Sequence, residues 1–96
     1  MAIVEHSRLA EELQKLEGWS GDVTSISKSY TFSSFMTGIE FVREIAEIAE
    51  EVNHHPDIDI RWRTVRVMLA THSEGGVTEK DISLAHKIEE VAARYL

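Results

Sequence analysis

The sequence predicts an α+β fold: a four-stranded antiparallel sheet with three helices packed on one face, in the order α-β-β-α-β-β-α. Apolar residues recur at helical spacing in three segments, three other segments alternate between apolar and polar residues, and a short strand precedes a tight turn. The chain has 96 residues and contains neither an internal repeat nor a linker, so residues 1–96 are expected to form a single domain.

The composition excludes several classes of function. A hydrophobic fraction of 43% with a single proline is typical of a globular chain. The absence of cysteine rules out disulfides, thiol catalysis and cysteine-ligated zinc. A net charge of −7 argues against nucleic-acid binding, and no apolar run is long enough to cross a membrane. Because Glu5, His6 and Arg8 interrupt any signal sequence after Met1, we expect a cytoplasmic protein.

Caps and periodicity predict the first three elements. A helix is expected from a cap at Ser7 to about Glu17, followed by a short strand at Trp19 and a tight turn over 20–22. Alternation over 23–32 predicts a half-buried strand. One face of that strand carries Ile26, Tyr30 and Phe32, and the other carries Ser25, Ser27, Ser29 and Thr31.

The longest helix should begin after a cap at Ser33 or Ser34. It should end at Asn53 or His54, because Pro56 disfavours helical geometry in the residue before it. Its predicted inner stripe is Phe35, Ile39, Val42, Ala46 and Ala49, with Ile45 and Val52 beside it. A second apolar strip, which suggests a contact with another subunit, comprises Met36, Phe41 and Ile48.

The second half of the chain predicts a hairpin and a final helix. Residues alternate over 58–62 and again over 64–72, and the short link between these strands favours a hairpin. The apolar face of the second strand is Val65, Val67 and Leu69. Thr78 opens the last helix. The expected inner face of this helix is Ile82, Ala85, Ile88, Val91 and Ala92.

Two adjacent histidines, His54 and His55, stand where the longest helix must stop. Imidazole titrates near neutral pH, so two rings that point into one pocket are suited to proton transfer. His72 stands at the end of a predicted strand, before a Gly-Gly loop, where it could converge with this pair. The alternative is that all three are ordinary polar residues at the ends of helices and strands.

Asp81 lies in the first turn of the last helix and has two possible roles. It could orient one of the histidine rings, or it could close a capping box with Thr78 at the spacing Thr-x-x-Asp. Three histidines and a carboxylate would also suit zinc. However, adjacent histidines make an awkward chelate and neither His-x-His nor His-x-x-x-His occurs among these residues, so we expect no metal.

The ordered set Glu50-x-x-x-His54-His55-Pro56, Trp62, Thr71-His72 and Gly75-Gly76-Val77-Thr78-x-x-Asp81-Ile82-x-Leu84-Ala85 resembles the pterin-4a-carbinolamine dehydratase family. That family is also known as the dimerisation cofactor of a homeodomain transcription factor. The match runs from about Trp19 to the C-terminus. It implies a dehydratase that removes water from 4a-hydroxytetrahydropterin to give quinonoid dihydropterin, in tetrahydrobiopterin recycling, without cofactor or metal.

The resemblance also implies the residues of the site. Its catalytic residues map onto His54, His55, His72 and Asp81. Its substrate-binding residues map onto Glu50, Asn53, His54, His55, Ala70, Thr71 and His72. We expect His54 and His72 to transfer protons and His55 to hold the pterin. Glu50 or Asp81 would orient a ring.

Two other functions are compatible with the pattern. One is a non-catalytic dimerisation or assembly scaffold for a transcription factor or another enzyme, and the other is a metal hydrolase. A scaffold has no chemical need for three histidines, so their presence favours the enzyme. The resemblance further implies a homodimer or homotetramer, and it identifies no other protein partner.

Overall fold

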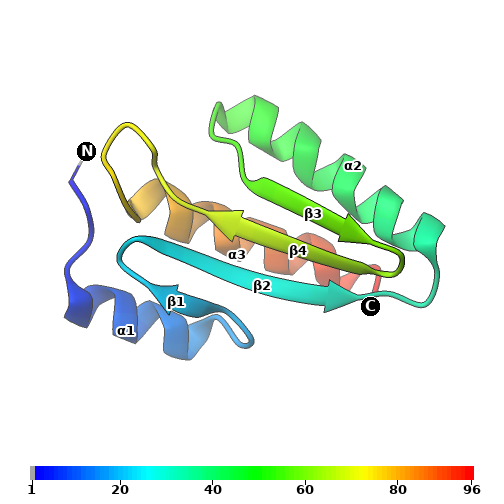
Figure 1. Ribbon diagram of the computed structural model, residues 1–96, viewed down its shortest axis with the longest axis horizontal. Helices are drawn as coiled ribbons and strands as arrows, with labels where there is room; N and C mark the ends of the chain where they lie inside the picture. The colour runs from blue at the N-terminus through cyan, green and yellow to red at the C-terminus, as the bar shows by residue number, and fades with distance from the viewer. Residues whose placement is uncertain (1) are drawn as a thin grey trace.

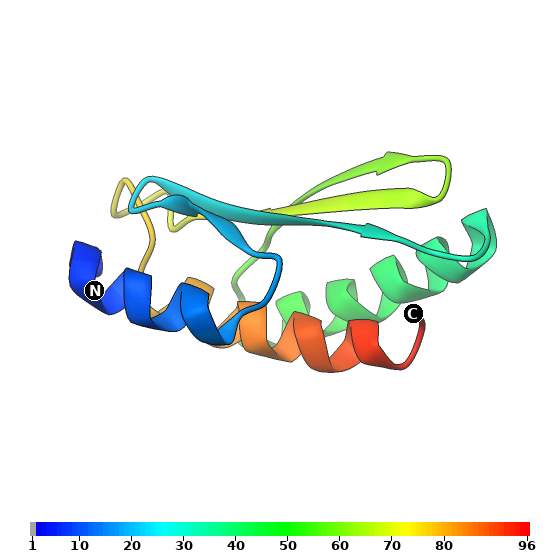
Figure 2. The same cartoon turned by 90° about the horizontal axis from the view of Figure 1, so that it is seen from below.

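The structure, a computed structural model, describes residues 2–96 and confirms the predicted architecture. Its elements are α1 (His6–Lys15), β1 (Ser20–Asp22), β2 (Ser25–Thr31), α2 (Phe35–Val52), β3 (Asp57–Arg61), β4 (Thr64–Leu69) and α3 (Glu79–Ala93). The strands form one antiparallel sheet in the order β1-β2-β4-β3 (Figure 1). The three helices lie on one side of this sheet and leave its other face open (Figure 2). Within residues 2–96, no helix combines the length and hydropathy needed to cross a membrane.

The pairing of β4 determines what lies at each end of the sheet. β4 pairs with β2 from Ile26↔Leu69 to Thr31↔Thr64, and β3 covers its other edge. The β3 ladder stops at Asp57↔Met68, so the edge of β4 beyond Met68 has no strand partner on that side. The α2–β3 and β4–α3 connections therefore leave the sheet at the same end, as Figure 1 shows.

The core lies between the sheet and the helices, largely on the predicted faces. The buried residues of the central strands and the residue after β2 are Ile26, Tyr30, Phe32, Val65, Val67 and Leu69. All five predicted inner residues of α3 are buried as well: Ile82, Ala85, Ile88, Val91 and Ala92. Alternation and helical spacing were reliable here because each of these elements has one face against the core and one polar face.

The prediction for the inner face of α2 was wrong in part. The buried residues of this helix are Gly38, Phe41, Ile45 and Ala49. Phe35 is 45% exposed and Ala46 is exposed too, whereas Phe41, expected at a subunit contact, is fully buried. The Phe41 ring packs against Tyr30 and Phe32, with centroids 5.1 and 4.9 Å away. A helix that is apolar on more than one side can present either side to the core, and this aromatic cluster selects the side with Phe41.

Element ends in the N-terminal part of the chain also differ from the prediction. α1 begins at His6 because Glu5, not Ser7, has the extended geometry of the N-cap. Residues 20–22, expected as a turn, form β1, and the turn follows at residues 23–24. There, Asp22 Oδ1 accepts a hydrogen bond from the N–H of Thr24 at 2.8 Å, which is a local bond typical of Asp in turns.

The predicted strands extended further than the observed ones, and Trp62 and His72 are among the residues that lie outside the strands. Trp62 occupies the β3–β4 turn with a φ of 52° and is 71% exposed. β4 ends at Leu69, so His72 lies in the loop that follows it. In contrast, the predicted caps are confirmed for Ser34, which caps α2, and Thr78, which caps α3.

Candidate active site

The C-terminal end of α2 determines where the two adjacent histidines lie. Asn53 adopts the left-handed conformation, with a φ of 53°. The N–H of His54 donates to the carbonyl of Ala49 at 3.1 Å. The N–H of Asn53 donates to the carbonyl of Glu50 at 3.3 Å. These are the two bonds of a Schellman motif, and Asn tolerates the left-handed region, so Asn53 has a structural reason to stand here.

The rings of His54 and His55 have different surroundings. His54 is mostly buried, with 12% of its side chain exposed, and its Nε2 lies 2.5 Å from Asp81 Oδ1. His55 is 53% exposed, and its Nε2 lies 2.5 Å from Oε2 of the exposed Glu50. Each of the two acids considered from the sequence therefore contacts a different histidine.

Asp81 combines the two roles that its sequence position left open. Its Oδ2 accepts the N–H of Thr78 at 2.8 Å, which closes the capping box of α3. The same oxygen accepts the hydroxyl of Thr71 at 2.8 Å, while Oδ1 faces His54. Asp81 and Thr78 have no exposed surface and Thr71 is buried. Such donors are required because a buried carboxylate without partners is costly.

Thr71 connects this buried cluster to the loop that carries His72. The N–H of Thr71 donates to the carbonyl of Gly76 at 2.8 Å, which closes a tight loop after β4. Gly75 has a φ of 80° in this loop, a conformation that favours glycine. His72 is exposed at the start of the turn.

Two cavities adjoin the cluster. One, of about 260 Å³, lies between the end of α2 and α3 and is lined by Val52, His54, Lys80, Ser83, Leu84 and Lys87, together with Glu79. The other, of about 330 Å³, lies at the end of β4, where its lining includes Asp57, Met68, Ala70, His72 and Gly76. The predicted histidines thus do not share one cavity: His54 lines the first, His72 lines the second and His55 lines neither. Asp81 bonds both His54, from the lining of the first cavity, and Thr71, which stands in the chain between Ala70 and His72 of the second.

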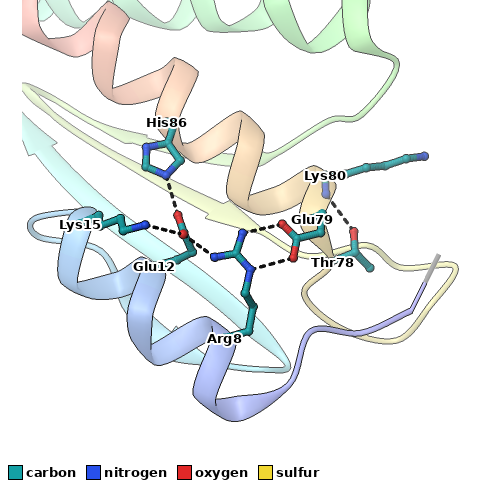
Figure 3. Close-up of polar contacts among 7 residues, drawn as sticks. All are labelled: Arg8, Glu12, Lys15, Thr78, Glu79, Lys80 and His86. Carbon is teal, nitrogen blue, oxygen red and sulfur yellow. Dashed lines mark hydrogen bonds and ion pairs between the residues drawn. The ribbon is translucent and has the colours of Figure 1, made fainter.

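A second buried carboxylate, which the sequence analysis missed, lies between α1 and α3 (Figure 3). Glu12 is 5% exposed and contacts Arg8, Lys15 and His86, with the His86 Nε2–Glu12 Oε1 distance at 2.8 Å. The hydrogen bond from His86, followed by that from Arg8, lowers the pKa of Glu12 to about 2. Arg8 and Glu12 have the i,i+4 spacing of a helix pair, but nothing local points to His86, which lies far along the chain.

The residues present do not resemble a metal centre. Among residues 2–96, no group of three or more His, Asp or Glu side chains is arranged to hold a metal ion. What the arrangement offers is one ring held by a buried carboxylate and two accessible rings at the same end of the sheet, which are groups suited to moving protons.

The chain matches known proteins over nearly its whole length. A profile of the family described as pterin 4 alpha carbinolamine dehydratase matches residues 3–91. A Mycobacteroides abscessus protein, provisionally named a pterin-4-alpha-carbinolamine dehydratase, is 51% identical over 89 residues, which cover 93% of this chain and 95% of that protein. A Mycobacterium tuberculosis protein with the same provisional name shows 51% identity over 89 residues and the same coverage.

Solved structures agree with these sequence matches. A Brucella melitensis protein described as a transcriptional coactivator/pterin dehydratase has a TM-score of 0.88 and 38% identity, over 93% of this chain and 97% of that one. A pterin dehydratase-like protein described as a RuBisCO assembly factor in the alpha-carboxysome has a TM-score of 0.65 over 77% of this chain and 86% of that one. At 21% identity, this second likeness is one of fold alone. The resemblance seen in the sequence motifs is confirmed, and the chain belongs to the pterin 4 alpha carbinolamine dehydratase family.

Proposed function

We propose that this protein removes water from 4a-hydroxytetrahydropterin to give quinonoid dihydropterin, as a step of tetrahydrobiopterin recycling. The observation that carries the proposal is the buried bond series from His54 through Asp81 to Thr71, the residue before His72. In the reaction the C4a–O and N5–H bonds break, a C4a=N5 double bond forms and water leaves. An acid must protonate the departing hydroxyl and a base must take the N5 proton, each contributing about 10²–10⁴-fold in rate.

The cavity at the end of β4 is the proposed pterin site. Beyond Met68, the edge of β4 has no strand partner on the β3 side, and such an edge presents backbone N–H and C=O groups. The pyrimidine ring of a pterin carries an amide-like set of donors and acceptors, which can pair with a strand edge as an added strand would. Ala70 and His72 line this cavity, and the backbone of Thr71 lies between them.

The proton transfers are assigned to His72 and to His54, which lines the neighbouring cavity and is linked through Asp81 to Thr71, the residue before His72. His72 lines the proposed pterin cavity directly. One ring nitrogen of His54 is bonded to Asp81, which orients the ring and leaves its other nitrogen for a proton. His55, which bonds Glu50 and precedes Asp57 of the cavity wall by two residues in the chain, would hold the pterin from the exposed side. The scheme moves protons and needs neither a metal nor a cofactor.

An absorbance assay with freshly generated 4a-hydroxytetrahydropterin tests the reaction. His54→Ala and His72→Ala should each lower the increment over the uncatalysed rate about tenfold or more. His86→Ala is the matched control, because it removes a histidine that also bonds a carboxylate but lies between α1 and α3. It should keep the wild-type increment. If folded wild-type protein gives no increment over the uncatalysed rate, the proposal is wrong.

A pair of cavity-filling variants tests the position of the substrate. Ala70→Leu adds bulk to the cavity beside His72, and Ser83→Leu adds comparable bulk to the cavity beside His54. We expect Ala70→Leu to raise KM strongly and Ser83→Leu to leave it near the wild-type value. The reverse result would place the pterin between α2 and α3 and contradict the proposed site.

We also propose that copies of the chain associate as a homodimer or homotetramer. Phe35 and Met36, at the start of α2, are 45% and 61% exposed, and Ile60 and Trp62, around the β3–β4 turn, are 39% and 71% exposed. These two segments lie side by side, at the opposite end of β4 from the candidate site (Figures 1 and 2). Exposed apolar groups gathered in this way are typical of an interface. Sedimentation should show an assembly that Trp62→Glu weakens, whereas a monomer at all concentrations would refute this.

A further inference from the structure

The buried carboxylate of Asp81 receives donors on both oxygens. Oδ2 lies 2.8 Å from the N–H of Thr78 and 2.8 Å from the hydroxyl of Thr71. Oδ1 lies 2.5 Å from His54 Nε2. The exposed fraction of Asp81 is 0%, so water does not supply alternative partners, and the orientation of the carboxylate is set by these protein groups.

The directions of the bonds among the hydroxyls follow from counting protons. Thr71 has a single hydroxyl proton, which it donates to Asp81, so its oxygen can serve only as an acceptor elsewhere. The Thr71 and Thr78 hydroxyl oxygens are 2.8 Å apart, and Thr78 must therefore be the donor in that bond. The oxygen of Thr78 in turn faces the backbone N–H of Lys80 at 3.3 Å. Each hydroxyl in the series then has one consistent orientation.

The donors from both sides end at the carboxylate, which also accepts from the histidine. A carboxylate oxygen accepts and does not donate, so the bond between Asp81 Oδ1 and His54 requires a proton on Nε2. We propose that Thr71, itself oriented by Thr78, is a positioning residue that holds Asp81 so that His54 carries Nε2–H and exchanges its catalytic proton at Nδ1. The assignment of Nδ1 to the reaction rests on the proposed dehydratase function. The protonation of Nε2 is inferred from the hydrogen bonds alone and does not depend on that function.

This inference changes the role expected for Thr71. The family resemblance implied a substrate contact, but the side-chain proton of Thr71 is committed to Asp81. Its hydroxyl is buried, with 6% of the residue exposed, so any contact with a pterin would come from the backbone. The hydroxyl acts on the reaction through Asp81 and His54.

Nitrogen-15 NMR of the histidine rings tests the protonation pattern without any substrate. In the neutral ring we expect wild-type His54, identified by its loss in His54→Ala, to show Nε2–H and an unprotonated Nδ1. In Asp81→Asn the N–H of Thr78 still needs an acceptor, so the amide oxygen should face Thr78 and the NH₂ should face His54. His54 must then accept at Nε2, and the proton should move to Nδ1. A wild-type ring that carries Nδ1–H would overturn the inference.

Thr71→Val tests the positioning role, because valine keeps the shape and removes the hydroxyl. We expect the single His54 pattern to be lost, with mixed or exchange-broadened ring signals, and kcat to fall more than KM changes. Thr71→Ser keeps the hydroxyl and should restore both the single His54 ring pattern and kcat. If the valine variant does not fold, a folded serine variant that lacks this pattern would refute the role of the hydroxyl. Thr64→Val is the matched control, because it removes a hydroxyl at the start of β4, where it bonds Thr31, whereas Thr71 follows the end of that strand. Wild-type ring signals in Thr71→Val would refute the role of Thr71.

Failure of this inference and failure of the proposed function have different signatures. If the ring signals behave as expected but folded wild-type protein has no dehydratase increment, the positioning of His54 stands and the assignment of Nδ1 to that reaction falls. If the increment is present but His54 carries Nδ1–H, the dehydratase function stands and the positioning inference falls.

Discussion

Two carboxylates that are almost completely buried each bond a histidine, but the groups around them differ in charge. Glu12, between α1 and α3, is held by Arg8 and Lys15 as well as His86. Asp81, at the candidate site, is held by a hydroxyl and a backbone N–H as well as His54. Of the three groups bonded to Asp81, His54 alone can carry a positive charge.

This difference separates a structural carboxylate from one suited to catalysis. The charges of Arg8 and Lys15 balance that of Glu12, and they act together with the hydrogen bond from His86, which is the largest cause of the lowered pKa of Glu12. Neutral donors orient Asp81 without cancelling its charge, so the proton on His54 remains coupled to the carboxylate. The same pair of residue types can therefore clamp two helices in one region and prepare a proton transfer in another.

The largest effect is expected at Asp81. Asp81→Asn should lower the catalysed increment by about 10²-fold or more, because the amide would donate to His54 and place its proton on the wrong nitrogen. The rate is measured at saturating pterin, and circular dichroism checks the fold. A catalysed increment within a few-fold of wild type would show that Asp81, like Glu12, is not required for catalysis.

Glu12→Gln should affect stability instead of activity. We expect the free energy of unfolding to fall by about 1–3 kcal/mol, because the charge-assisted bonds at a buried position are lost, while the dehydratase increment stays at the wild-type level. Urea titration measures the first quantity. Glu79→Gln, which removes an exposed partner of the same Arg8, is the control and should cost less.

Protonation of Glu12 should contribute to the pH dependence of the free energy of unfolding. Its folded-state pKa of about 2 lies below the ordinary value of 4.5, so the unfolded chain binds the proton more readily. The contribution of Glu12 is therefore complete above about pH 4.5 and is lost as the pH falls towards about 2. The urea midpoint of the wild type should drop more than that of Glu12→Gln between about pH 6 and about pH 3. Parallel changes in the two proteins would contradict this.

The smallest effect is expected at the third histidine–carboxylate pair. Glu50 and His55 are bonded at 2.5 Å, but their side chains are 78% and 53% exposed. Glu50→Gln should change the free energy of unfolding by less than about 0.5 kcal/mol, because water screens and replaces such a pair. A larger loss of unfolding free energy in a urea titration would show that the exposure of the three histidine–carboxylate pairs does not predict their contributions to stability.

Local patterns were sufficient for much of the architecture. The alternation of Val65, Val67 and Leu69 and the helical spacing of Ile82, Ala85 and Ile88 correctly identified the buried faces of β4 and α3. They failed on α2, where Phe41 and not Phe35 faces the core. That helix has apolar residues on two sides, and the choice between them depends on the rings of Tyr30 in β2 and Phe32 just after it, which no local spacing records.

The candidate site also combines features that local sequence determines with features that depend on tertiary contacts. The sequence by itself determined the order of helices and strands, the capping box of Thr78 with Asp81, the stop of α2 before Pro56, and, through its motifs, the family. These features depend on neighbours within a few residues or on the identity of single residues.

The tertiary structure alone decided the partners of those residues. It brought His54 to Asp81 and His86 to Glu12, across 27 and 74 residues of chain, and it assigned His54 and His72 to different cavities. The Thr71 hydroxyl was likewise committed to Asp81 by the return of the chain at Gly76. Contacts of this kind arise when packed layers bring distant segments together, so sequence spacing carries no record of them.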